Sequence, residues 1–254
     1  MRSSGRLPIV RCHQSDLLKT SSVTSTLYHA VYDEAGDTGF HLRSSRYIVG
    51  VAVLSQSLHD LQRIAWTVRK DARKGHIRLP ELKARLVPEW LVYTGLNNAM
   101  RWEWSAIIAV IDKGSRQHGP NNSEEIYRRL TAHVAKICVI RYPLLHFVVD
   151  RRYTKQALCD RLVEAIQLQI AASGLNAILT IEQAPSEQRK ELLLADYLAW
   201  AVFQKYERKC LEGYQIVSSR IDCEEIGRWN EVMFPMDEKT AWHPGGQLSP
   251  FETE

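Results

Sequence analysis

One aspartate in an otherwise apolar segment is the residue whose type and position most strongly indicate chemistry. Asp196 lies in the run from Leu192 to Phe203, where only the Tyr197 hydroxyl offers another side-chain oxygen for hydrogen bonding. A segment this apolar, without Gly or Pro, predicts a buried helix. A lone buried carboxylate costs several kcal/mol unless a cation or a hydrogen-bond donor compensates it. We therefore expect Asp196 to face either a metal ion or a buried basic partner.

Acids also follow several of the apolar runs that predict strands. Such acids are Asp33, Asp112, Asp150 and Glu182. Two carboxylates about 4 Å apart repel by roughly 4 kcal/mol at an effective dielectric constant of about 20. The repulsion is relieved when one of them is protonated or when a cation bridges them. Carboxylate oxygens at this spacing suit Mg²⁺ or Mn²⁺.

The apolar periodicity predicts an α/β chain in which helices connect the later strands. The expected strands span residues 28–33, 46–54, 104–111, 144–150 and 176–182. The expected helices span residues 57–74, 81–97, 123–141, 154–172 and 188–209, and Pro88 could interrupt the second of them. Right-handed crossovers return each later strand parallel to its predecessor. This order predicts a ribonuclease-H-like mixed five-stranded sheet, three antiparallel strands and then two parallel ones, with helices on both faces.

That topology would bring most of the strand-end acids to one edge of the sheet, where open α/β sheets bind ligands. The first and fourth strands would be neighbours about 4.8 Å apart, so Asp33 and Asp150 could share a cation. The second strand separates Asp112 from them, which makes it the least expected partner. Two-metal carboxylate sites promote in-line attack on phosphate diesters. The sequence predicts a four-acid site for two ions, made by Asp33, Glu81, Asp150 and Asp196.

Local structure offers another explanation for several of these acids. Asp33 and Asp37 flank a glycine turn, where acids are favoured for local reasons. Asp112 and Glu182 are more often ordinary strand-end acids than ligands. Three acids are kept as alternatives to the ligands or as groups that support them: Glu34, Asp37 and Glu182.

Basic residues near the acids indicate either nucleic-acid binding or a solvated helix face. The cluster around Trp66 and Glu81 contains Arg69, Lys70, Arg73, Lys74 and Arg85. Arginine and lysine near a metal site hold phosphates, and Trp66 could stack a base. We expect Trp66 in the core instead. Arg151 and Arg152 follow Asp150 directly and would steady a phosphate or neutralise the acids.

Composition bounds the remaining choices. The 254 residues, with a net charge of +4, fit one main domain over residues 27–212. A mobile tail is expected over residues 1–26, and a partly irregular extension packed on the domain over residues 213–254. Five cysteines without CxxC spacing argue against a disulfide framework or a structural zinc site and favour the cytoplasm. No apolar run reaches membrane-spanning length, so no membrane partner is expected.

Four short motifs resemble those of one bacterial family, the domain of unknown function 3800. The segment 32–40, Tyr-Asp-Glu-Ala-Gly-Asp-Thr-Gly-Phe, resembles its Asp-Glu-Ser-Gly-Asp signature, with Ala35 in place of Ser. Glu81-Leu82-Lys83 resembles its Glu-Leu-Lys element. Residues 147–152 resemble its strand that ends in Asp, and residues 195–201 its late Ala-Asp helix. Leu193 stands where that helix often carries Gln. The resemblance spans roughly residues 28–220.

The resemblance implies a ribonuclease-H-like, metal-dependent nuclease of a type often linked to bacterial mobile-element or defence loci. Its ligands for Mg²⁺ or Mn²⁺ would be the four acids of the predicted site, and Lys83 or Arg151 would stabilise charge on the phosphate. The substrate would be RNA or DNA. The alternative is a catalytically silent module of the same fold that binds nucleic acid or a partner protein. A homo-oligomer is compatible with both.

Overall fold

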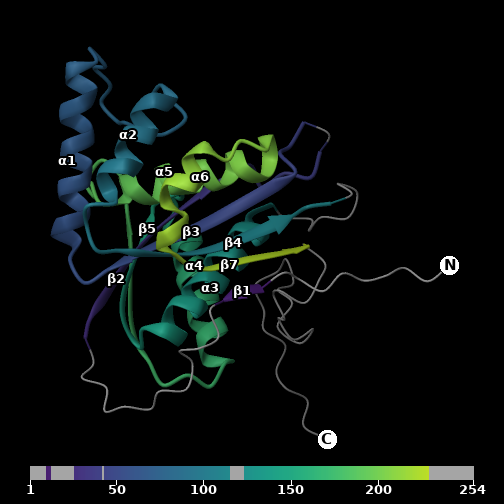
Figure 1. Ribbon diagram of the computed structural model, residues 1–254. Helices are drawn as coiled ribbons and strands as arrows, with labels where there is room; N and C mark the ends of the chain where they lie inside the picture. Colours follow the sequence, from purple (N-terminus) through teal and green to yellow (C-terminus); the bar gives the residue numbers. More distant parts are fainter. Residues whose placement is uncertain (1–9, 13–25, 42, 115–122, 229–254) are drawn as a thin grey trace, which may run out of the picture.

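The chain forms one mixed β-sheet with helices packed on both faces (Figure 1). The computed structural model describes residues 10–12, 26–41, 43–114 and 123–228. In those residues the sheet has seven strands in the order β1-β7-β4-β3-β2-β5-β6.

The strands β2 to β6 follow the apolar runs of the sequence, whereas β1 and β7 were not expected. They are β1 (Val10–Cys12), β2 (Tyr28–Ala35), β3 (Tyr47–Ser55), β4 (Ser105–Asp112), β5 (Leu144–Asp150), β6 (Ile178–Ala184) and β7 (Ile221–Arg228). The helices are α1 (Leu58–Lys74), α2 (Glu89–Ala99), α3 (Ser123–Arg141), α4 (Gln156–Ala171), α5 (Leu192–Phe203) and α6 (Glu212–Val217). A π-helical turn (Gln204–Arg208) extends α5, and a short 3₁₀ turn (Ser218–Arg220) precedes β7. No helix of the described residues is long and apolar enough to cross a bilayer.

The five expected strands occur in the expected order and directions. The β2–β3 and β3–β4 pairs are antiparallel, and β5 and β6 run parallel to β2. The strand count of five is wrong, because β7 pairs parallel with β4 and β1 pairs with β7. The residues of β7 include three acids in eight, which hides its apolar pattern, and its pairing depends on backbone hydrogen bonds to β4.

Two apolar cores lie on opposite sides of the sheet. Strand β3 is buried along its whole length, and its alternate side chains enter different cores. Val49 and Val51 pack with α1, α2, α5 and α6, whereas Ile48 and Ala52 pack with α3 and α4. Figure 1 shows the same division, with α1, α2, α5 and α6 above the sheet and α3 and α4 below it. Helix α5 lies directly on β2 and β3.

The expected helix over residues 81–97 is wrong for residues 81–87, and the interruption that Pro88 could cause is present. Residues 81–87 form an irregular loop, and α2 begins at Glu89 after Pro88. Proline restricts the residue before it to extended conformations, so a helix cannot continue through Val87 into Pro88. The loop is nevertheless fixed, because Leu82, Ala84 and Val87 are buried in the core beneath α1 and α5.

The two ends of the chain are described only in part. Val10–Cys12 forms β1, whereas residues 1–9 and 13–25 of the expected tail lie outside the described residues. Of the expected C-terminal extension, residues 213–228 form most of α6, the 3₁₀ turn and β7, and residues 229–254 lie outside the described residues.

We predict that Gly36 is essential for the turn that ends β2. Its φ is +99°, and a Cβ there would lie 2.4 Å from the Tyr47 carbonyl oxygen. Gly174 also has a positive φ, +65°, but a Cβ there would meet nothing within 4 Å. Gly174→Ala should therefore cost about 1 kcal/mol, and Gly36→Ala about 2–4 kcal/mol. Urea unfolding followed by circular dichroism would test this, and equal losses would contradict it.

Candidate functional site

Asp33 and Asp150 lie side by side at one end of the sheet. Strands β2 and β5 are parallel neighbours, and Tyr32 pairs with Val149 in their register. The next residue on each strand is an aspartate, as expected from the sequence. Neighbouring strands are about 4.8 Å apart, which places both carboxylates in one small region. Asp33 also accepts a hydrogen bond from the Glu34 backbone N–H, at 2.8 Å.

Asp196 reaches this region from α5. Its Oδ2 accepts a hydrogen bond from the backbone N–H of Ala84 at 2.6 Å. Asp196 and Asp33 line the same pocket, and their charges interact. The compensation expected for Asp196 therefore comes first from a backbone donor in the loop over residues 81–87. The same loop also supplies a cation.

That cation is Lys83, whose ammonium lies among the acids. Its Nζ is 2.6 Å from Asp150 Oδ2 and 3.7 Å from Glu81 Oε1. Glu81 also accepts a hydrogen bond from the Ser186 hydroxyl. The loop, β5 and the connection between β6 and α5 are thereby joined at one point. The structure thus brings together the four acids of the sequence prediction and Lys83.

The four acids outnumber the Lys83 ammonium, and the pKa values of two of them are raised. Burial raises the pKa of Asp33 well above its usual range, and the charges of Glu34, Asp196 and Asp150 raise it further against the effect of Lys83. Burial likewise raises the pKa of Asp196 to about 6, although the Ala84 N–H and Lys83 oppose the shift. Burial alone would lower the pKa of Lys83, but its hydrogen bond to Asp150 and the nearby acids raise it. Lys83 is therefore a charged counter-ion.

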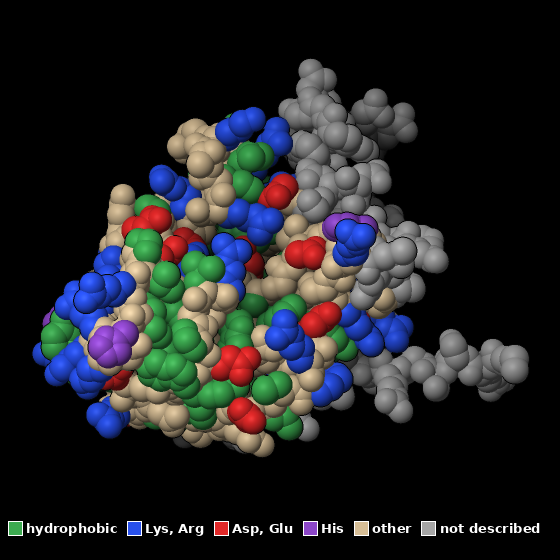
Figure 2. Space-filling model, turned by 90° about the horizontal axis from the view of Figure 1, so that it is seen from above, with side chains coloured by type: hydrophobic (Ala, Val, Ile, Leu, Met, Phe, Trp, Pro, Cys, Tyr) green, Lys and Arg blue, Asp and Glu red, His purple; other side chains and the backbone are tan. Residues whose placement is uncertain are grey.

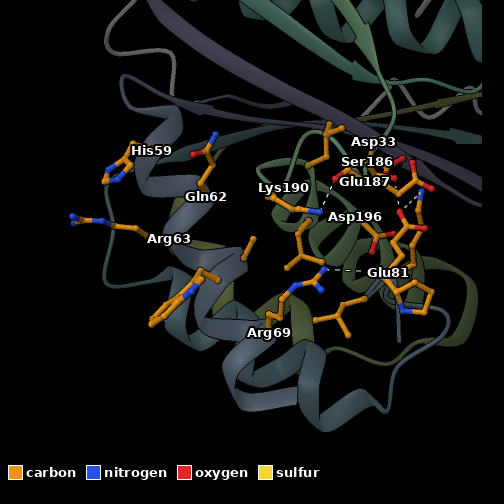
Figure 3. Close-up of a pocket in the computed structure, with 17 residues that line it drawn as sticks. Asp33, His59, Gln62, Arg63, Arg69, Glu81, Ser186, Glu187, Lys190 and Asp196 are labelled. Carbon is orange, nitrogen blue, oxygen red and sulfur yellow. Dashed lines mark hydrogen bonds and ion pairs between the residues drawn. The ribbon is translucent and has the colours of Figure 1, made fainter. Parts of the chain in front are cut away.

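A pocket of about 400 Å³ opens beside the acids. It lies between α1, the loop over residues 80–83 and the start of α5. Figure 3 shows Asp33, Glu81 and Asp196 gathered at one side of it, with Gln62 on α1 across the pocket. A volume of this size is within the range of small-ligand sites, about 300–1,000 Å³.

The acids have the donor chemistry and the excess charge for a hard divalent cation. All four donors are carboxylates, the ligands that Mg²⁺ and Mn²⁺ prefer. In the described residues, however, no three His, Cys, Asp or Glu side chains are grouped as metal ligands. The Lys83 ammonium lies against Asp150 and near Glu81. The chemistry of these four donors thus suits such a cation, whereas their arrangement in the described residues has Lys83 as the counter-ion of Asp150.

The alternative acids have partners of their own. Asp37 accepts backbone hydrogen bonds from Gly39 and Ser45 within the turn, as the local explanation predicts. Glu182 pairs with Arg189 and with His146. Each of these acids is therefore accounted for by neighbours away from the Lys83 ammonium.

Asp112 and Glu34, which lie at the ends of β4 and β2, form ion pairs with arginines. Asp112 accepts two hydrogen bonds from Arg46, at 2.7 and 2.9 Å. Glu34 lies 3.0 Å from Arg152, which also lies 3.5 Å from Glu124. Burial still raises the pKa of Glu34 in spite of Arg152. Of the two roles expected for Arg152, the structure therefore shows the neutralisation of acids, Glu34 and Glu124.

The expected basic cluster is divided between different surroundings. Arg69 lines the pocket, where its guanidinium donates a hydrogen bond to the Pro80 carbonyl at 3.4 Å. Lys74 pairs with Asp71 at 3.0 Å, and Arg73 lies in the last turn of α1. Arg85 and Arg151 are exposed. Figure 2, a view from above, shows Lys and Arg side chains gathered at the left, the side on which α1 lies in Figure 1.

The expectation that Trp66 belongs to the core is wrong. Trp66 is 66% exposed and lines the pocket, and Lys70 Nζ lies 5.7 Å from its ring centroid. The core-facing residues of α1 are Leu61, Ile64, Ala65, Val68 and Ala72. Trp66 lies one position beyond this stripe, which the helical spacing alone could have indicated.

Sequence reasoning missed the residues of the pocket that come from the connection between β6 and α5. Ser186 and Lys190 both line the pocket, together with Gln62 and Arg63 of α1. The connection follows the carboxyl end of a parallel strand, a place where α/β sheets bind ligands. That rule was a usable signal for Ser186 and Lys190. Nothing in the sequence pattern marks Gln62 or Arg63.

Comparisons of the sequence with known proteins give no relatives. A scan against protein-family models finds no match, and a search of curated proteins finds no similar sequence. The family resemblance of the four motifs therefore stays a prediction.

We predict that Asp196 destabilises the fold at neutral pH. Its pKa of about 6 lies above the ordinary value of 3.8, so between about pH 4 and pH 6 the folded state binds more protons than the unfolded chain. The free energy of unfolding should therefore fall as the pH rises through this range. Asp196→Asn should be more stable than wild type at pH 7 and should lose part of this dependence. Urea unfolding across the pH range, with a chelator present, measures both effects.

Asp112→Asn is the control with the opposite sign. Burial alone would raise the pKa of Asp112, but the Arg46 guanidinium outweighs it and lowers that pKa. Asp112 therefore stabilises the fold at neutral pH, and this variant should be less stable than wild type at pH 7. Loss of stability in Asp196→Asn at pH 7 would contradict the prediction.

Proposed function

We propose that the protein is a divalent-metal-dependent nuclease that hydrolyses phosphodiester bonds of RNA or DNA. One observation carries the proposal: four carboxylates from three separate elements and a loop converge beside a pocket with a single ammonium among them. Buried like charges are costly and accumulate where a cation or a reaction requires them.

The sheet order supports a ribonuclease-H-like interpretation. The order β4-β3-β2-β5-β6, with its antiparallel and parallel pairs, is the one expected for that fold. The resemblance of residues 32–40, 81–83, 147–152 and 195–201 to the domain of unknown function 3800 family points to the same activity. The strands β1 and β7 are additions at one edge, away from Asp33 and Asp150.

The proposal assigns the residues of the site three roles: binding the metal, binding the phosphate and orienting Asp196. Asp33, Asp150, Asp196 and Glu81 would hold Mg²⁺ or Mn²⁺. When bound, such an ion neutralises phosphate oxygens and makes water nucleophilic near neutral pH. Lys83 would leave Asp150 and donate hydrogen bonds to a non-bridging phosphate oxygen. The Ala84 N–H holds the Asp196 carboxylate in orientation at 2.6 Å.

We predict that cleavage requires Asp33 and Asp196 and does not require Asp112. Labelled single-stranded, duplex and hybrid substrates would be incubated with Mg²⁺ or Mn²⁺. Asp33→Asn and Asp196→Asn should each lower kcat by about 100-fold or more, because each loses a charged ligand. Asp112→Asn is the matched control, since Asp112 ends a strand at the same edge but pairs with Arg46. Cleavage at the wild-type rate by Asp33→Asn and Asp196→Asn would show that these acids are not metal ligands of the reaction.

The second candidate is a silent module of the same architecture that binds nucleic acid or a partner protein. The contact of Lys83 with Asp150 at 2.6 Å favours it, because an ammonium can replace a metal as the permanent counter-ion. This candidate gains support if no substrate is cleaved with any metal while Asp196→Asn keeps its binding.

We predict that a divalent ion can take over the neutralising role of Lys83. In a chelator, Lys83→Met should lower Tm, because the acids lose the ammonium among them. Mg²⁺ or Mn²⁺ should restore that Tm and should also raise the Tm of the wild type. Lys74→Met is the control, since the exposed Lys74–Asp71 pair contributes little. Thermal unfolding with and without metal measures these changes. If neither ion changes the Tm of the wild type or of the two variants, the proposed metal site is wrong.

A further inference from the structure

A large aromatic side chain is exposed on the wall of the acidic pocket. Trp66 projects from α1 with 66% of its surface in solvent, and it lines the same pocket as Asp33, Glu81 and Asp196. Burying a tryptophan ring is strongly favourable, so an exposed one beside a ligand-sized cavity indicates a contact made with a ligand.

One cation of α1 lies close to this ring, and two others line the same pocket. Lys70, one helical turn after Trp66, places Nζ 5.7 Å from the ring centroid. Arg63 and Arg69 lie one turn before it and one turn after it, and both line the pocket. Lys190 lines the pocket from the end of the connection between β6 and α5. This arrangement of one aromatic ring with basic groups around it matches a chain that alternates flat bases and phosphates.

Apolar side chains line the pocket together with the tryptophan and the acids. Leu82, Leu192 and Leu193 line it, together with Ala65 of α1. A leucine-lined surface accepts the face of a nucleobase but offers nothing to its hydrogen-bonding edges. Contacts of this kind hold a base without reading its identity.

We propose that Trp66 stacks an unpaired nucleobase and thereby selects single-stranded nucleic acid as the ligand of this pocket. The inference rests on the proposed nuclease function and adds its substrate class. The adjacent phosphate lies toward Asp33 and Asp196, and Arg69 and Lys190 hold the flanking backbone. Bases of a duplex are stacked inside the helix, so a duplex cannot offer this face. The cations around the ring favour a polyanion over an aromatic peptide.

Binding without metal tests the subsite separately from cleavage. Fluorescently labelled strands of about eight nucleotides, DNA and RNA, would be titrated in a chelator against the full chain. Trp66→Ala should weaken binding of both strands by about 5- to 150-fold, and Trp66→Phe should keep most of the affinity. Trp90→Ala is the matched control, because Trp90 is 46% exposed and lies outside the pocket. It should bind as the wild type does.

Two further ligands make the result specific to stacking. A strand of abasic nucleotides should bind the wild type more weakly than the normal strand, and Trp66→Ala should not distinguish the two. A blunt duplex of the same length should bind more weakly than either single strand. Affinity that is unchanged in Trp66→Ala, equal for abasic and normal strands, or highest for the duplex would overturn the subsite.

The outcomes separate this inference from the nuclease proposal. Trp66-dependent binding without cleavage in Mg²⁺ or Mn²⁺ would support the subsite and reject the nuclease. Cleavage that needs Asp33 and Asp196 but is insensitive to Trp66→Ala would support the nuclease and reject the subsite. Failure of every strand to bind would reject the subsite as well. Tighter binding of RNA or of DNA in the titrations would identify which of the two is the preferred single-stranded ligand of the pocket.

Discussion

An excess of carboxylate charge in buried and half-buried positions is the constraint on which the rest of this structure depends. Asp33, Asp150 and Asp196 meet at one end of the sheet, where the loop over residues 81–87 offers them the Lys83 ammonium and the Ala84 N–H. Such a cluster raises the free energy of the folded state, as the raised pKa values of Asp33 and Asp196 show. Carboxylates whose pKa values are raised by burial and by one another are typical of functional sites.

The loop over residues 81–87 links the architecture to this chemistry. It has no regular secondary structure, yet three of its side chains are buried under α1 and α5. That burial fixes the backbone, and the fixed backbone presents the Ala84 N–H to Asp196 and Lys83 to Asp150. Pro88 ends the loop and starts α2. Changes in the packing of α1 against α2 would therefore act on the acids through this segment.

The pocket joins two kinds of surface. The acids line it from β2, from the loop and from α5, and Trp66 lines it from α1 together with Arg63 and Arg69. In the proposed function, the acids would hold the cation at the reacting phosphate, and the basic groups would hold the flanking backbone of the nucleic acid. The same helix supplies apolar residues to the core, so one element both closes the fold and shapes the pocket.

The sequence by itself determined the order of the central strands and the acids that end β2 and β5, because apolar periodicity and strand-end positions are local properties. It also singled out Asp196 as a buried acid in an apolar helix. Only the tertiary structure decided that residues 81–87 are a loop, that Trp66 is exposed and that Lys83 lies against Asp150. Strand β7 likewise depended on its pairing with β4. These features arise from contacts between segments far apart in the chain, which no local pattern records.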